Sequence, residues 1–266
     1  MTWERLAVTL LLQQYRPTPE EDELLRADVR RMWSASAQTA HPGSSNVTKA
    51  ALATRQLAFH KAAAGVDGPQ AAQYGHDRWS VLINESAAWM VAKALGQRWA
   101  SMVPPTMIRS LWPAPPLVHG FGVFSVGKPG ETSRIEPLND AALCDAAAFF
   151  DALIGQQDRH QTNYRWDQAS GSLGLIDNAY AFAAPGSSSA TGGVFLPHAS
   201  LFVERRNQDG RKPLSQAEVG ALGTLLGNQP LLDNLSRILR PEQFAALKVR
   251  AERMQSSAEL LDVLEF

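Results

Sequence analysis

The spacing of apolar residues predicts helices at the start of the chain. Apolar side chains recur at helical spacing over residues 3–15. A second helix is expected from Thr18, which forms a capping box with Glu21, and its basic end extends to Arg31. Because neither helix carries a chemical motif, we interpret residues 1–40 as a small N-terminal helical cap.

Two later segments alternate with the period of two that is typical of β-strands. In the first, Leu57, Phe59 and Lys61 fall on one face, and the second covers residues 117–126. The stretch between them predicts a helix over 77–95, because an aspartate precedes it and a glycine follows its apolar run. The prolines before the second strand exclude a regular helix there.

The second half of the chain is predicted to be mainly helical. Residues 140–153 form an apolar, alanine-rich helix, and residues 215–263 form two or three helices, one of which begins at Pro241. The glycine- and serine-rich segment 183–194 fits two interpretations equally well, a loop that orders on the acceptor and an ordinary linker. Together with the strands, this pattern indicates an α+β fold with a small β-rich lobe and a larger helical lobe.

Composition and charge exclude several classes of partner. The chain has 266 residues, 45% of them apolar, which is enough for two lobes around a cleft. Its 26 acidic and 25 basic residues nearly cancel, so we expect no nucleic-acid partner and no membrane partner. Cys144 is the only cysteine, so no intrachain disulfide can form. The apolar run at 7–12 is too short to span a membrane and lacks a signal-peptide pattern, so we expect a cytoplasmic protein.

Two acids and one amide within residues 151–182 are spaced as a metal-dependent phosphoryl transfer requires. Asp158 would orient the acceptor hydroxyl and take its proton, whereas Asn163 and Asp177 would hold Mg²⁺ against the phosphates of ATP. The spacing from Asp158 to Asn163 is also that of the protein-kinase catalytic loop. His160 would support the transferring group or the loop, although a purely structural histidine fits equally well.

A lysine and a glutamate earlier in the chain fit the phosphate-binding part of such a site. Lys61 closes an apolar strand face, where a lysine needs an anionic partner that nucleotide phosphates would supply. Glu85 lies on the next helix, from which its carboxylate would pair with Lys61. The plainer alternatives are a lysine that reaches water and a solvated acid on a helix face. Small residues at 41–48 predict either a phosphate-binding turn or a simple linker.

Two motifs resemble those of a known superfamily. DRHQTN and LIDNAYAF, joined by a predicted turn at 168–171, resemble the catalytic and metal-binding loops of phosphatidylinositol 3- and 4-kinases. They also resemble the small bacterial kinases of that superfamily and, more distantly, the HipA toxin-kinases. The run NESAAWMVAKALGQRWASMVPPTMIR is similar to a helix-plus-VPxT segment of the bacterial members. One departure is Ala179, where many relatives have glycine, and this would stiffen the loop.

The resemblance implies a two-lobed protein-kinase-like fold, with a small lobe at 41–126 and a large lobe at 127–266. It also implies nucleotide contacts from a phosphate loop, and adenine contacts from the backbone between the lobes. These candidate contacts are Ser44, Ser45, Asn46, Phe124 and Val126.

The candidate residues predict an ATP- and Mg²⁺-dependent kinase that phosphorylates a hydroxyl of a small-molecule or natural-product acceptor. A compact chain without accessory domains favours that acceptor, whereas the resemblance to toxin-kinases allows a regulatory protein Ser/Thr kinase. A nucleotide-binding module without catalysis is a third hypothesis, and the complete set of candidate residues argues against it. A lipid acceptor is least expected, since no basic or amphipathic membrane-binding stretch is evident.

Overall fold

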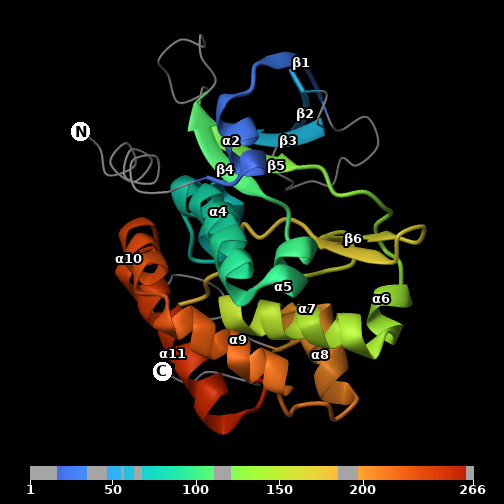
Figure 1. The fold of residues 1–266 in the computed structure, drawn as a ribbon, viewed down its shortest axis with the longest axis vertical. Helices are drawn as coiled ribbons and strands as arrows, with labels where there is room; N and C mark the ends of the chain where they lie inside the picture. The colour runs from blue at the N-terminus through green and yellow to red at the C-terminus, as the bar shows by residue number, and fades with distance from the viewer. Residues whose placement is uncertain are drawn as a thin grey trace.

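The computed structural model describes residues 17–34, 47–54, 57–62, 68–110, 121–184 and 197–261. Figure 1 shows a small lobe built on a curled antiparallel sheet, next to a larger lobe that is mainly helical. The predicted α+β fold class, with a small β-rich lobe and a helical large lobe, is therefore confirmed. In these segments, no helix is long and apolar enough to cross a bilayer.

The small-lobe sheet has five strands in the order β1-β2-β3-β5-β4, and all neighbours are antiparallel. The strands are β1 (Val29–Ser34), β2 (Val47–Leu52), β3 (Leu57–Ala62), β4 (Thr106–Ser110) and β5 (Phe121–Val126). β3 confirms the first predicted strand, and β5 confirms the described part of the second. Nothing in the proline-rich sequence before β5 predicted β4.

The first described helix is shorter than the sequence predicts. α2 (Pro19–Arg26) begins with the predicted capping box, but it ends at Arg26 because Ala27 adopts an extended conformation. The chain then continues as β1, which pairs with β2. The sheet therefore begins inside the segment 1–40 that was interpreted as a helical cap. The helix predicted at 3–15 lies outside the described residues.

The remaining elements connect the lobes and build the large lobe. They are α3 (Gly68–Gln73), α4 (Arg78–Leu95), α5 (Gln97–Met102), α6 (Glu136–Asn139), α7 (Ala141–Ile154), the hairpin β6 (Tyr164–Asp167) and β7 (Ser172–Leu175), η3 (Pro197–Ala199), α8 (Leu201–Gln208), α9 (Gln216–Gly227), α10 (Gln229–Ile238) and α11 (Pro241–Ser257). The hairpin turn falls at the predicted residues 168–171.

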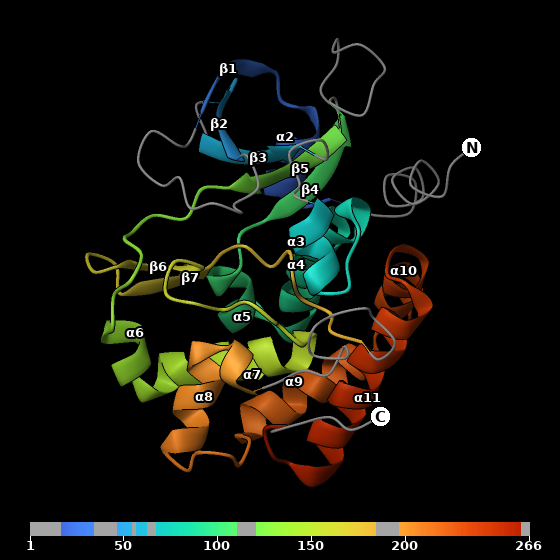
Figure 2. The same cartoon turned by 180° about the vertical axis from the view of Figure 1, so that it is seen from behind.

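α4 joins the two lobes. It begins at Asp77, whose carboxylate accepts hydrogen bonds from two backbone N–H groups, and it ends at Gly96, as predicted. It is buried along nearly all its length and packs against β4 and β5 on one side and α9 and α10 on the other (Figures 1 and 2). From α2, the buried Glu21 carboxylate accepts hydrogen bonds from Trp89 Nε1 and Lys93 Nζ. These contacts fix the middle of α4 between the lobes.

β3 directs alternate residues into two environments. Ala58 and His60 are buried with Phe124 in the small-lobe core, whereas Leu57 is 40% exposed. The expected apolar face of Leu57, Phe59 and Lys61 is therefore not the core face of the sheet. It is the opposite face, and it carries Lys61 to α4.

Gly155, the C-cap residue of α7, has both a positive φ and close packing against a buried arginine. Its φ is +61°, and an added Cβ would lie 2.8 Å from Cζ of the buried Arg250. Gly171 has nearly the same φ, +62°, but nothing within 4 Å of an added Cβ. We expect Gly171→Ala to lower the free energy of unfolding by about 1–2 kcal/mol, and Gly155→Ala to lower it distinctly more. Urea unfolding measures both, and equal losses would contradict the close packing against Arg250.

Candidate active site

Three charged side chains from separate segments meet between the lobes. Lys61 comes from β3, Glu85 from the middle of α4, and Asp177 from the loop after β7. Lys61 Nζ lies 2.9 Å from Glu85 Oε1 and 2.8 Å from Asp177 Oδ1. The predicted pair of Lys61 and Glu85 is therefore present, and Asp177 joins it.

Burial and mutual attraction compete in this cluster. The side chains of Lys61 and Glu85 are 8% and 7% exposed, whereas that of Asp177 is 41% exposed. Burial alone would lower the pKa of Lys61, but the two carboxylates outweigh it and raise that pKa. Burial raises the pKa of Glu85 despite Lys61, while Lys61 holds the pKa of Asp177 below its usual value against the effect of burial. The result is a charged lysine beside an ionised, partly exposed Asp177.

α4 also fixes the loop that carries Asp177. Glu85 uses its second oxygen, Oε2, to accept a hydrogen bond from the backbone N–H of Asn178 at 2.9 Å. The neighbouring Asn84 donates to two carbonyls of the same loop, at 2.9 Å each. Asp177 has a φ of +56°, but Ala179 is not in the left-handed region, so the loop has no need of glycine there.

Asp158 and Asn163 lie in the loop between α7 and β6. Asn163 Nδ2 donates to the carbonyl oxygen of Asp158 at 2.7 Å, which fixes the orientation of the amide. The backbone N–H of Ile176 donates to the Asn163 carbonyl at 3.2 Å, which joins this loop to the Asp177 segment. These contacts hold the candidate base and both candidate metal ligands in one connected backbone arrangement.

The donors present fit Mg²⁺. The side-chain oxygen of Asn163 accepts no hydrogen bond from the described residues, so it is available as a ligand together with the Asp177 carboxylate. Mg²⁺ commonly takes one or two protein oxygens and completes its shell with water and phosphate. Within the described segments, no group of three or more His, Cys, Asp or Glu side chains could hold a metal ion.

The environment of Asp158 favours a proton acceptor. Burial raises its pKa, and His160, whose Nε2 lies 3.7 Å from Asp158 Oδ2, only partly offsets this effect. A carboxylate with a raised pKa is a stronger base. The His160 side chain is 50% exposed, so the ring is accessible to a ligand. The loop holds the ring through Nδ1, which lies 2.9 Å from Thr162 Oγ1.

Arg159 connects both loops to the large-lobe core. The fully buried guanidinium pairs with Asp151 on α7 at 3.0 Å. It donates to the carbonyls of Asn163 at 2.6 Å and Ile176 at 2.5 Å, and to Asn178 Oδ1 at 2.6 Å. The sequence interpretation missed this role. The available signals were an arginine inside the DRH motif and Asp151, the second of two acids in an alanine-rich helix.

A tyrosine also reaches the candidate base. The hydroxyl of Tyr74, in the turn after α3, lies 3.3 Å from Asp158 Oδ1, and its ring stacks on Tyr180 with 4.3 Å between centroids. No motif predicted this contact, because it depends on how the segment before α4 folds across the large lobe.

The predicted nucleotide contacts are not all brought to this site. Ser44, Ser45 and Asn46 lie outside the described residues, so their role stays a prediction. Phe124 is fully buried in the small-lobe core. Phe124 and Val126 lie opposite His60 and Ala58 of β3, and the backbone N–H of Val126 donates to the carbonyl of Pro105 at 2.9 Å. The adenine contact expected at these two positions stays a prediction.

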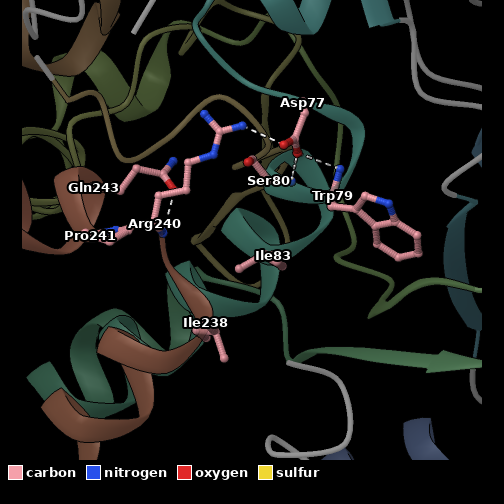
Figure 3. A pocket seen from close by; sticks show the side chains of 8 residues that line it. All are labelled: Asp77, Trp79, Ser80, Ile83, Ile238, Arg240, Pro241 and Gln243. Carbon is pink, nitrogen blue, oxygen red and sulfur yellow. Dashed lines mark hydrogen bonds and ion pairs between the residues drawn. The ribbon is translucent and has the colours of Figure 1, made fainter. Parts of the chain in front are cut away.

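Another hollow lies where α4 begins beside the junction of α10 and α11. Figure 3 shows this pocket of about 240 Å³, which the ion pair of Arg240 and Asp77 crosses with 2.5 Å between Nη2 and Oδ2. None of the predicted site residues lines it. The lining residues are Asp77, Trp79, Ser80, Ile83, Ile238, Arg240, Pro241 and Gln243.

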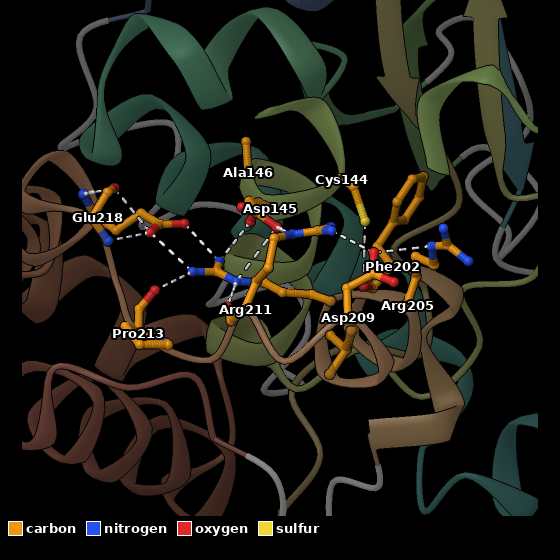
Figure 4. Close-up of polar contacts among 12 residues, drawn as sticks. Cys144, Asp145, Ala146, Phe202, Arg205, Asp209, Arg211, Pro213 and Glu218 are labelled. Atoms are coloured by element: carbon orange, nitrogen blue, oxygen red, sulfur yellow. Dashed lines mark hydrogen bonds and ion pairs between the residues drawn. The ribbon is translucent and has the colours of Figure 1, made fainter. Parts of the chain in front are cut away.

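A second buried arginine, Arg206 on α8, stabilises the large lobe. It pairs with Glu218 on α9 at 2.8 Å and donates to the carbonyl oxygen of Asp145 at 2.9 Å. Figure 4 shows this region, where Arg211 also contacts Asp145. This network has the same chemistry as that of Arg159 but contacts none of the predicted site residues.

Comparison with solved structures supports the architecture. The Golgi casein kinase superposes with a TM-score of 0.55 at 14% identity, over 92% of this chain and 77% of that one. The Golgi casein kinase with Mn/ADP bound gives 0.56 at 13% identity, over 97% and 82%. The fold is kinase-like. A Helicobacter pylori proinflammatory kinase, CtkA, gives only 0.43 at 11% identity, over 89% and 94%. No protein-family model matches the sequence, and no curated protein matches it. The phosphatidylinositol 3-/4-kinase assignment therefore remains a resemblance.

We expect Arg159→Met to impair ligand binding as well as stability, whereas Arg206→Met should impair stability alone. Each substitution leaves a buried carboxylate unpaired, which costs about 3–5 kcal/mol of unfolding free energy. Of these two arginines, Arg159 is the one that contacts the two loops of the candidate site. Urea unfolding and Mg·ATP titration of the folded fraction measure the two effects. Unchanged Mg·ATP affinity in Arg159→Met would contradict its positioning role.

Proposed function

We propose that this protein is a Mg·ATP-dependent kinase that transfers the γ-phosphoryl group to a hydroxyl of a small-molecule acceptor. The observation that carries the proposal is the contact of Lys61 with both Glu85 and Asp177. A buried lysine held between a helix carboxylate and a loop carboxylate is the arrangement that kinases use around the nucleotide phosphates. The likeness of the fold to a kinase structure with Mn/ADP bound supports a nucleotide and a divalent ion.

The nucleotide would lie against the exposed face of β3. Lys61 would contact its phosphates, with Glu85 holding the ammonium in place, and Asn163 and Asp177 would hold Mg²⁺. When bound, the ion would neutralise charge that develops on the transferred group. Adenine would lie near Leu57, whose side chain is 40% exposed on the same strand face. These roles follow from the chemistry of the donors and their positions between the lobes.

Asp158 would take the proton of the acceptor hydroxyl. Its raised pKa suits this role, and Asn163 orients its backbone. Since phosphoryl transfer depends mainly on positioning and charge, the base contributes only part of the rate. Arg159 would act indirectly, by keeping the catalytic and metal-binding loops in register.

A regulatory protein Ser/Thr kinase is the second candidate function. The observation in its favour is the likeness of the fold to the Golgi casein kinase, whose name describes a protein acceptor. Incubating the purified protein and ATP with separate small-molecule and protein fractions, followed by mass spectrometry, would distinguish the acceptors. A nucleotide-binding module without catalysis would phosphorylate neither fraction.

We predict Mg·ATP binding that depends on Lys61 and Asp177. Lys61→Ala removes the phosphate contact, and Asp177→Ala removes a metal ligand, so each should weaken the affinity strongly. Isothermal calorimetry measures the dissociation constants, with circular dichroism to confirm folding. As a matched control, Lys248→Ala removes an exposed lysine of α11 and should bind normally. Wild-type affinity in both site variants would contradict the assignment.

We further predict that Asp158→Asn keeps Mg·ATP affinity but loses turnover. An amide preserves the shape of the carboxylate but cannot accept the proton, and Asn163 and Asp177 remain to hold the metal. We expect the rate to fall by about 10²-fold, the lower end of the range for general-base catalysis. ADP release with an acceptor, or with water in its absence, measures the rate. A near wild-type rate would show that Asp158 is not the base.

A further inference from the structure

The hydroxyl of Tyr74 occupies a defined position at the candidate base. It donates a hydrogen bond to Asp158 Oδ1 at 3.3 Å. The other carboxylate oxygen, Oδ2, lies near Asn163 Nδ2 at 3.4 Å and near His160 at 3.7 Å. Within the described residues, Tyr74 therefore supplies the one hydroxyl that contacts this carboxylate.

Several contacts hold the Tyr74 ring in this position. The ring is half-buried and stacks on Tyr180, in the loop that also carries Asp177. The backbone N–H of Tyr74 bonds the carbonyl of Ala71, and Gly75 follows with a φ of +75°, which turns the chain into α4. The Tyr74 hydroxyl thus comes from the segment that connects β3 to α4, and it reaches a loop of the large lobe.

A hydroxyl that donates to the base is what an acceptor presents to a phosphotransferase. A general base must lie within hydrogen-bond reach of the proton it removes, and such contacts are often long before the nucleotide binds. We propose that Tyr74 is an intramolecular phosphoacceptor, which receives the γ-phosphoryl group of ATP bound at the site of Lys61 and Asp177. This inference rests on the proposed function.

The transfer balances with Mg·ATP alone. The Tyr74 oxygen forms a bond to the γ-phosphorus while the bond from that phosphorus to the β,γ-bridging oxygen breaks, and ADP leaves with the electron pair. The phenolic proton passes to Asp158 and then to water. Burial and Asp158 raise the pKa of Tyr74 to about 12, so the phenol is protonated at neutral pH and its attack needs a base. Asp158 Oδ1, which already accepts the hydrogen bond of the Tyr74 hydroxyl, is positioned to be that base.

Phosphorylation would change which hydroxyls can reach the base. A phosphate on Tyr74 would lie beside the carboxylates of Asp158 and Asp177, and like charges at short range repel. Tyr74 would then leave the base, and its position would become available to an external hydroxyl. The modification would therefore convert a site blocked by its own tyrosine into one that is open to its acceptor.

The test uses the purified full chain with Mg²⁺ and ATP, and it needs no external acceptor. Intact-mass measurement and peptide mapping follow phosphate incorporation, and ADP release is recorded in parallel. We expect one phosphate on Tyr74, with a first-order rate that does not change with protein concentration. Tyr74→Phe should abolish it, and Asp158→Asn should slow it by about 10²-fold. Tyr164→Phe, which alters a tyrosine bonded to the Arg134 carbonyl, should incorporate phosphate normally.

Each other result would overturn the inference in a distinguishable way. Asp158-dependent ADP release without phosphate on Tyr74 would refute it and leave the proposed kinase function standing. A rate proportional to protein concentration would show transfer between molecules instead of within one. Failure to bind Mg·ATP would refute both the inference and the proposed function.

Discussion

The buried guanidinium of Arg159 is the contact on which the arrangement of the site depends. Asp151, on α7, neutralises the charge of Arg159. The remaining donors of Arg159 fix backbone and side-chain oxygens on both sides of the β6–β7 hairpin. An arginine can do this because its planar fork presents five donors, whereas a lysine offers a single point charge. The candidate base and the candidate metal ligands thus lie on loops, but one side chain anchors these loops to the large-lobe core.

The second constraint is the position of α4. The helix belongs to the large-lobe apolar core and also packs against the small-lobe sheet, so Glu85 lies at a fixed point between the lobes. Its two oxygens hold Lys61 from the sheet and the backbone of Asn178 from the loop. One carboxylate therefore ties the strand of Lys61 to the loop of Asp177. Loss of Glu85 would leave the buried Lys61, among the described residues, with the partly exposed Asp177 as its remaining ion-pair partner.

Local sequence patterns predicted the fold class, the capped α4 and the hairpin, because caps, apolar periodicity and turn residues are local signals. They also predicted the ion pair of Lys61 and Glu85, because that prediction requires only two opposite charges on a strand and on the helix that follows it. The end of α2 was wrong, since pairing with β2 outweighed the helical charge pattern. Tyr74 and Arg159 were missed because their partners are set by tertiary packing. The adenine contacts expected at Phe124 and Val126 stay predictions, and alternation alone did not show that β5 is an inner strand.

The most direct test of the kinase account is an experimental structure of the protein with Mg²⁺ and a non-hydrolysable ATP analogue. The account predicts that Asn163 Oδ1 and the Asp177 carboxylate coordinate the ion. It also predicts that Lys61 contacts the phosphates while it keeps its ion pair with Glu85. A nucleotide bound elsewhere, or Lys61 and Glu85 pointing to opposite sides of the protein, would contradict the account.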